Sequence, residues 1–226
     1  MRYKNLILIG SSHVSKDSVN EVKSTIENKK PGIIAVELDK DRFQALLSSK
    51  KRSYWIKGVG VKGMLFALFG AWIEKKIGQI VKVEPGSEMK MAINLARQNN
   101  LKLALIDQHI TVTLRRFSQT ITWREKWNFI SDLILGVIMP KRQMKKFNLT
   151  QNDLTKVPDS RTINKMLEFT KKRYPNFYNV LVHERNIVMA NNISHLMKNS
   201  PDETIMAVVG AGHQEEMMKM IKNNLK

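Results

Sequence analysis

Asn5-Leu-Ile-Leu-Ile-Gly-Ser-Ser-His13 and Thr204-Ile-Met-Ala-Val-Val-Gly-Ala-Gly-His213 stand near the two ends of this 226-residue chain. Each stretch is an apolar, partly β-branched run that is followed by Gly-x-x-His and a helix-like segment. Short continuous apolar runs of this kind are typical of strands buried in a sheet. A fold that pairs the two strands would bring two imidazoles together, and imidazole is a common metal ligand in proteins.

Two further apolar runs lie between these stretches, at Ile33–Val36 and Leu101–Ile106. A helical pattern separates the N-terminal strand from Ile33–Val36. Another helical pattern, which begins after Pro85-Gly86, precedes Leu101–Ile106. Buried strands joined by helices indicate parallel pairing. We therefore expect an α/β fold with a central, largely parallel sheet, built from β-α-β units at both chain ends, and a large helical middle.

The length suits one domain, which we expect to span residues 1–226. Segments 40–80 and 115–199 are predicted as helical insertions that cap this domain. Within the second segment, Trp123 to Met139 and Asn176 to Met197 are predicted as helices.

Each predicted strand ends in a polar or ionisable residue: His13, Glu37, Asp107 and His213. Ligands of open parallel sheets bind outside the carboxyl ends of the strands, so these four side chains should converge on one edge. Gly10 and Gly210 allow sharp turns there, and the helix N-termini that follow favour an anion or a developing oxyanion.

Structural roles are open alternatives for several of these residues. Glu37 follows an apolar run and needs a positive partner if buried, and Arg42, five residues later, could supply it. Glu184 and Arg185 lie in a helical pattern, where ordinary solvated charges are the simpler interpretation. The other histidines are interpreted as surface or core residues: His109, His183 and His195.

Composition limits the chemistry and the partners. The chain has no cysteine, so a metal would be held by His, Asp and Glu, and we expect a reducing, cytoplasmic location. The net charge of +18 suggests an anionic partner or merely solvated lysines. Nucleic acid is not favoured, because no recognised binding motif is present.

Residues 50–76, with basic ends around an apolar middle, are a candidate anchor on an anionic membrane surface. Their apolar stretch, 58–73, is interrupted by Lys62 and too short to span a bilayer.

Several motifs, in order along the chain, resemble those of the TraB/PrgY (pheromone shutdown) family. They are Gly10-Ser-Ser-His13, Ala35-Val-Glu37-Leu-Asp39-Lys-Asp-Arg42, Gly86-Ser-Glu88-Met89, Leu105-Ile-Asp107 with Thr113-Leu-Arg115-Arg116, Glu184-Arg185-Asn186, and Val208-Val-Gly210-Ala-Gly-His213. The chain departs from the family pattern at Gln108, where arginine is common, and at Asn186, where the family has an acidic residue.

The resemblance implies a fold related to TIKI-type metalloproteases and, more distantly, to erythromycin esterase and ChaN-like proteins. It also implies a divalent-metal hydrolase acting on peptides, with Mn²⁺ or Co²⁺ as the ion. Zn²⁺ is a further candidate, because imidazole and carboxylate ligands suit it as well. By this resemblance the metal ligands are His13, His213 and Glu37, and the catalytic residues are Glu37, Glu184, Arg115 and Arg185. Further pocket residues are Gly10, Arg42, Glu88, Asp107 and Gly210. A non-catalytic membrane-surface or regulatory binding module is the alternative, and an oligomer is compatible with either.

Overall fold

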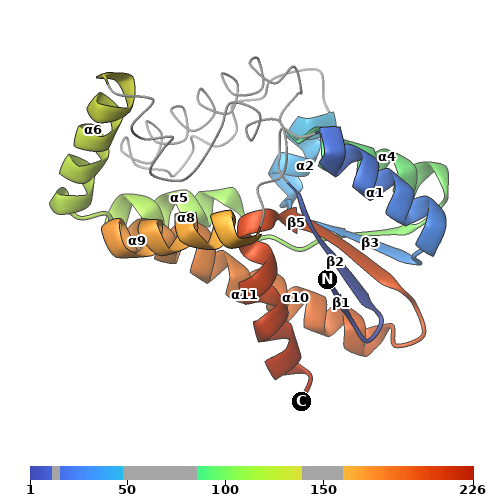
Figure 1. The fold of residues 1–226 in the computed structure, drawn as a ribbon. Helices are drawn as coiled ribbons and strands as arrows, with labels where there is room; N and C mark the ends of the chain where they lie inside the picture. Colours follow the sequence, from blue (N-terminus) through green and yellow to red (C-terminus); the bar gives the residue numbers. More distant parts are fainter. Residues whose placement is uncertain (12–15, 48–85, 139–159) are drawn as a thin grey trace.

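The computed structural model describes residues 1–11, 16–47, 86–138 and 160–226. Its sheet has the strand order β1-β2-β5-β3-β4 (Figure 1). The strands are β1 Arg2–Tyr3, β2 Leu6–Ser11, β3 Ile33–Val36, β4 Lys102–Leu105 and β5 Ile205–Gly210. The expected α/β fold with a mostly parallel sheet is confirmed. The short edge strand β1, which pairs antiparallel with β2, was not predicted, because two residues carry no periodic signal.

The central position in the sheet belongs to β5, which is parallel to both β2 and β3. Its register places Ser11 of β2 opposite Gly210 of β5, and Val36 of β3 opposite Val208. The two strands that carry the Gly-x-x-His motifs are therefore neighbours. Their carboxyl ends, together with that of β3, meet at one edge of the sheet.

Helices cover both faces of the sheet (Figure 1). On one face, α1 Lys16–Lys29 and α4 Ser87–Gln98 pack on Ile9, Ile34 and Met206. On the other, α10 Glu184–Asn199 and α11 Ala211–Asn224 pack on the side chains that alternate with them along the strands: Leu8, Ile33, Ala35, Ala207 and Val209. The strands β2, β3 and β5 are covered on both faces, which is why they are apolar throughout rather than alternating.

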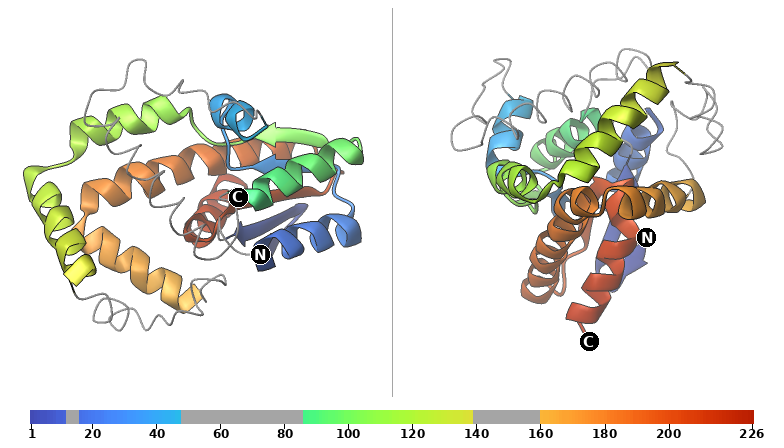
Figure 2. Two further views of the ribbon diagram at one scale, coloured as in Figure 1. Left: turned by 90° about the horizontal axis from the view of Figure 1, so that it is seen from above. Right: turned by 90° about the vertical axis from the view of Figure 1, so that its left-hand side faces the viewer.

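Four further helices form an arm that extends away from the sheet, most visible in the left view of Figure 2: α5 Ile110–Thr120, α6 Trp123–Ile138, α8 Ser160–Arg173 and α9 Pro175–Tyr178. Helix α2 Lys40–Leu47 lies beside the sheet instead, where its apolar side chains pack against the core. This agrees with the helical middle expected from the sequence. The predicted insertion at 40–80 falls mostly outside the described residues. None of the described helices has the length and apolar character needed to cross a bilayer.

One predicted helix is wrong in detail. Asn176 to Met197 is not a single α-helix, because a π-helical turn, η3, occupies Asn179–His183 between α9 and α10. A π-turn accommodates one extra residue without a break in the helical hydrogen bonding, so hydrophobic periodicity does not reveal it. The turn sets the direction in which Glu184 and Arg185, at the start of α10, project.

The buried carboxylate of Glu125 attaches α6 to the start of α9. It accepts hydrogen bonds from the backbone N–H groups of Thr122 (3.0 Å), Asn176 (2.8 Å) and Phe177 (3.3 Å), and from the Asn176 amide (2.9 Å). Burial raises the pKa of Glu125, but these hydrogen bonds outweigh it and hold the pKa below its ordinary value.

The low pKa of Glu125 makes its contribution to stability dependent on pH. Because the folded pKa is lower than the unfolded one, the contribution is present above about pH 4.3 and is lost as pH falls toward the folded pKa. We expect Glu125→Gln to reduce the unfolding free energy by about 1–2 kcal/mol at pH 7 and to flatten its acid dependence. Urea titrations between neutral and acidic pH measure both effects, and an unchanged acid slope in the variant would contradict this role.

Candidate active site at the carboxyl ends of the central strands

Glu37 lies directly after β3, and the neighbouring strand β5 holds it in place. Its Oε2 accepts a hydrogen bond from the backbone N–H of Gly210 at 2.6 Å, and its Oε1 contacts the guanidinium of Arg185. The Glu37 side chain is only 4% exposed. A buried carboxylate needs such partners, because an unpaired charge in the interior is very costly. The Glu37 carboxylate thus links the end of β3 to the turn at Gly210 and to α10.

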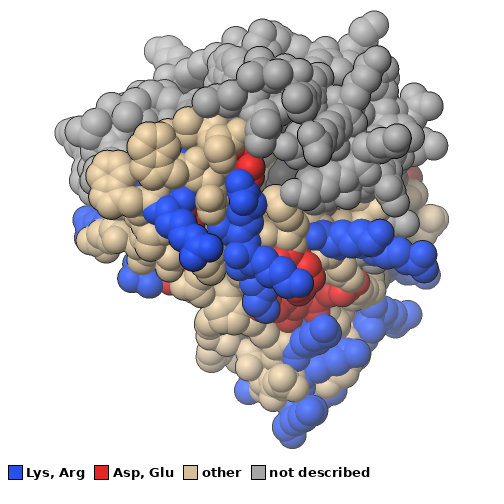
Figure 3. All heavy atoms as spheres, turned by 60° about the vertical axis from the view of Figure 1, so that its left-hand side comes forward, with Lys and Arg blue, Asp and Glu red and all other residues tan. Residues whose placement is uncertain are grey.

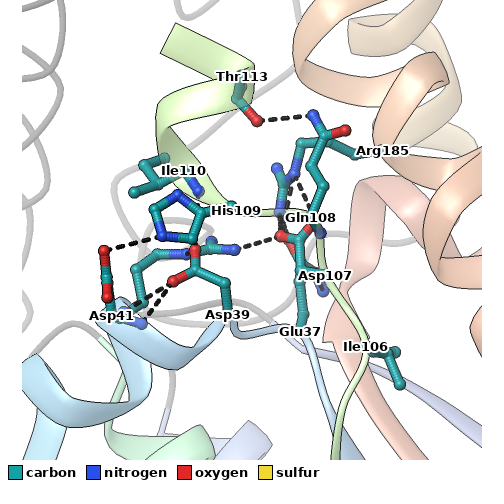
Figure 4. Close-up of polar contacts among 12 residues, drawn as sticks. Glu37, Asp39, Asp41, Ile106, Asp107, Gln108, His109, Ile110, Thr113 and Arg185 are labelled. Atoms are coloured by element: carbon teal, nitrogen blue, oxygen red, sulfur yellow. Dashed lines mark hydrogen bonds and ion pairs between the residues drawn. The ribbon is translucent and has the colours of Figure 1, made fainter. Parts of the chain in front are cut away.

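Arg185 joins two buried carboxylates, Glu37 and Asp107 (Figure 4). Its Nη2 lies 2.5 Å from Asp107 Oδ2, and its Nη1 donates to the Leu181 carbonyl of the π-turn at 3.2 Å. Burial would lower the pKa of Arg185, but the charges of Glu37 and Asp107 raise it above its ordinary value. Arg185 is therefore a permanent cation at the centre of the strand-end cluster.

Arg42 is not the partner of Glu37, so that structural alternative is wrong. Its guanidinium lies instead between Asp39, with Nε 2.8 Å from Oδ2, and Asp107, with Nη2 2.5 Å from Oδ2. Asp39 also caps α2 by accepting from the N–H groups of Asp41 and Arg42. Arg42 is therefore directed along the first turn of α2 toward β4, whereas Glu37 points toward β5 and α10.

His213 lies in the first turn of α11, and its tautomer follows from its neighbours. Asn186 donates through Nδ2 to Glu216 Oε2 at 2.6 Å, because a carboxylate can only accept. The Asn186 oxygen must then face His213 Nδ1, 2.6 Å away, so Nδ1 carries the proton. His213 Nε2 consequently directs its lone pair at the strand-end cluster, 3.4 Å from Arg185 Nη1.

Glu216 organises the groups behind His213. Besides Asn186, it binds His183 Nδ1 at 2.7 Å and accepts from the Tyr178 hydroxyl at 3.1 Å. Burial raises the pKa of Glu216, but the hydrogen bonds from His183, Asn186 and Tyr178 bring it below its ordinary value. Burial and the nearby carboxylate raise the pKa of Tyr178 to about 12. His183 is therefore part of this network and not an ordinary surface histidine.

The nitrogen and oxygen donors at this edge have a spacing suited to a divalent ion. His213 Nε2 and Glu37 Oε1 are 3.4 Å apart. Ligand bonds of about 2.0–2.2 Å at angles between octahedral and tetrahedral place neighbouring donors about 3.0–3.5 Å apart. The imidazole–carboxylate set with a neutral Nε2 fits Zn²⁺, Mn²⁺ or Co²⁺. A second imidazole, His13, lies outside the described residues, so its pairing with His213 stays a prediction.

Asp39, Asp41 and His109 form another group with metal-ligand spacing, all within 4.8 Å. Their atoms already have structural partners. Asp39 caps α2 and also accepts from the N–H of Ile110 at 3.0 Å. His109 Nε2 pairs with Asp41 at 3.0 Å (Figure 4), and its Nδ1 binds the Thr111 hydroxyl at 2.7 Å. This group therefore links the starts of α2 and α5, and the assignment of His213 and Glu37 as metal ligands stays a prediction.

The other predicted site residues lie around this centre. Glu88, buried in the first turn of α4, accepts from the hydroxyl of Ser11 at the end of β2, at 3.4 Å. The Glu184 carboxylate pairs with Arg116 at 2.7 Å and with the Asn179 amide, away from Glu37. Arg115 is exposed on α5. A side chain at Gly10 would meet Gln214, whose amide donates to the carbonyl of Leu8.

Sequence reasoning missed the residues that orient His213. Asn186 was noted only as a departure from a family pattern, and Glu216 was not considered. One signal was present: Glu216 follows His213 by three residues, which places both on one side of α11. Gln108, noted as a departure from the family pattern, donates to the Thr113 hydroxyl at 2.7 Å, while Asp107 is neutralised by Arg42 and Arg185.

Asn186 is expected to control the tautomer of His213. Replacing it by leucine removes the Nδ1–H acceptor, so the Nε2–H tautomer becomes populated and metal affinity falls about 10–100-fold. Imidazole ¹⁵N shifts and metal titration measure the two effects. Asn192→Leu, on the same helix but bonded to the Ile106 carbonyl, is the matched control. An Nδ1–H shift that persists in Asn186→Leu would contradict this assignment.

Comparison with known proteins agrees with this architecture. Residues 3–222 match the model of the TraB/PrgY/gumN family. An uncharacterized protein of Methanocaldococcus jannaschii, MJ1365, is 36% identical over 96% of the chain, and a TraB domain-containing protein of Bos taurus is 23% identical over 91%. The chain spans 53% and 59% of the lengths of these relatives. With Glu37, Asp107, Arg185 and His213 gathered at one sheet edge and a match over almost its full length, the chain belongs to the TraB/PrgY/gumN family.

Proposed function

We propose that the protein is a divalent-metal-dependent hydrolase that acts on peptides. The observation that carries the proposal is the orientation of His213: Asn186 holds its Nδ1, and its Nε2 faces Glu37 at 3.4 Å. His213 and Glu37 would hold the ion, with His13 as a third candidate ligand. When bound, such an ion lowers the pKa of a water ligand toward neutrality and polarises a carbonyl group.

The protein groups around this edge have separate tasks in the proposal. Glu37, fixed by Gly210 N–H and Arg185, is the ligand or the acceptor of the water proton. Arg185 balances the carboxylates and offers its Nη1, 3.4 Å from His213 Nε2, to a developing oxyanion or to a substrate carboxylate. The resemblance also implied Glu184 and Arg115 as catalytic. They remain candidates outside the centre formed by His213 and Glu37, because Glu184 is paired with Arg116.

A cavity of about 510 Å³ beside the centre offers room for a peptide segment. It lies between α8 and the start of α11 and is lined by Tyr178, Gly212 and Glu216, among others. Glu216 connects it to His213 through Asn186. Neither His213 nor Glu37 lines the cavity, which lies on the side of the residues that orient His213 Nδ1, so it would bind a part of the substrate away from the reacting atoms.

Metal-free protein supplied with Mn²⁺, Co²⁺ or Zn²⁺ and a mixed peptide library tests the proposal. We expect cleavage, followed by mass spectrometry, only with metal present, and its loss on chelation. Glu37→Gln should abolish cleavage, whereas Glu203→Gln, which changes an exposed ion pair with Lys102, should not. Stoichiometric metal binding without cleavage of any peptide would reject the peptidase, and failure to bind any of the three ions would reject the metal site as well.

A further inference from the structure

Helix α6 has an unusual orientation, with its apolar side chains directed outward. Trp123 is 72% exposed, Trp127 67% and Ile130 45%. Positions i, i+4 and i+7 share one side of a helix, so the three side chains form a continuous stripe. Large exposed apolar stripes are uncommon on folded proteins and mark sites of interaction.

The opposite side of α6 is polar and faces the protein. Glu125 binds the start of α9, and Asn128 donates to the carbonyl of Arg173 at 3.3 Å. Asp132 accepts from Arg173 Nε at 2.5 Å and from the Tyr174 hydroxyl at 2.5 Å. These contacts fix the rotation of the helix about its axis. The apolar stripe therefore cannot turn toward the protein without the loss of several partly buried hydrogen bonds.

Cations flank the stripe. Arg124 is exposed beside Trp123, and Lys126 Nζ lies 4.4 Å from the centre of the Trp123 ring. Lys171 and Lys172 occupy the last turn of α8, next to the residue that Asp132 binds. Figure 3, in which the side of the molecule bearing α6 comes forward, shows many Lys and Arg side chains on this face, beside uncharged surface and around a patch of Asp and Glu.

We propose that α6 docks this protein onto an anionic lipid surface, with the stripe Trp123, Trp127 and Ile130 in the interface and Arg124 and Lys126 on the headgroups. Tryptophan favours the membrane–water boundary, because its ring is apolar and its N–H is polar. Basic residues beside such a stripe add attraction to anionic headgroups. The net charge of +18 acts in the same direction.

This surface differs from residues 50–76, the anchor considered from the sequence. A helix that lies flat needs apolar residues on one side and cations at its flanks, and α6 has both. The charge distribution favours lipid over a second copy of the chain, because the cations that flank the two apolar stripes would repel each other.

Flotation with vesicles of phosphatidylcholine alone, or mixed with phosphatidylserine, tests the proposal. We expect binding to the mixed vesicles that weakens at high salt. Trp123→Ser with Trp127→Ser should weaken it at least about tenfold, and so should Arg124→Glu with Lys126→Glu. Trp123, Trp127 and Arg124 are exposed and Lys126 is half-buried against the Trp123 ring, so circular dichroism should show the same melting as in the parent protein.

Matched controls separate docking by α6 from general attraction. Val112→Ser with Ile187→Ser removes two exposed apolar side chains elsewhere, and Lys90→Glu with Lys198→Glu makes the same change in net charge. Each control should retain most of the binding. The proposal would be overturned if the Arg124/Lys126 variant and the Lys90/Lys198 variant lost vesicle binding equally. Full vesicle binding by the tryptophan variant would also overturn it. So would absence of vesicle binding together with self-association that the tryptophan changes abolish.

Discussion

Replacing Arg185 by methionine is expected to lower the unfolding free energy by about 3–5 kcal/mol, the cost of leaving buried charges without their partner. Arg185 is the cation shared by Glu37 and Asp107, whose side chains are 4% and 0% exposed. Methionine matches much of its length but carries no charge. Both carboxylates would then lose an ion pair, and the Leu181 carbonyl would lose a donor.

Arg116→Met is the matched control, because Arg116 pairs with Glu184 at the surface and should leave the unfolding free energy nearly unchanged. Urea titrations of both variants measure the difference. Arg185→Met combined with Asp107→Asn should cost less than the sum of the single changes, since the second removes a charge that the first left unpaired. Equal stability of the two arginine variants would show that Arg185 does not neutralise this cluster.

The second large effect is expected at the metal. His213→Ala should reduce the affinity for Mn²⁺, Co²⁺ or Zn²⁺ by more than about 100-fold, beyond the loss that residues next to a ligand cause. The removed Nε2 is the donor that lies 3.4 Å from Glu37 Oε1. Peptide cleavage should fall with metal binding, and extra metal should not restore it.

Isothermal titration and the visible spectrum of the Co²⁺ form measure that loss directly, without reference to a substrate. His195→Ala, an exposed imidazole on α10, is the control and should bind metal like the parent protein. His13→Ala is expected to weaken binding as well, which would test the predicted pairing of the two Gly-x-x-His motifs. Retention of stoichiometric metal by His213→Ala would reject the site.

The fold was predictable because its signals are local. Apolar runs such as Ile33–Val36 require burial on both faces, and the intervening helical patterns require parallel pairing. The ends of these strands also indicated Glu37, Asp107 and His213 as neighbours, since parallel strands end at one edge. The order of the strands was not predictable, because no sequence pattern within β5 indicates that it lies between β2 and β3.

The partners of the site residues were harder to predict. Glu37 could pair with Arg42, close in sequence, or with Arg185, which is 148 residues away, and only packing separates the two. The role of Asn186 likewise depends on Glu216, 30 residues further along, which forces its amide to turn its oxygen to His213. The π-turn before α10 sets which of Glu184 and Arg185 points inward, and no periodicity reveals it.

The central place of β5 has a consequence for how this chain acquires its structure during synthesis. Glu37 meets Gly210 only after 173 further residues have been made, and β2 and β3 have no common partner before then. Such distant pairing slows folding and leaves apolar strand edges exposed while the ribosome completes the chain. The strand-end cluster and the sheet therefore form in one late step, and a chaperone that shields β2 and β3 should raise the yield of folded protein.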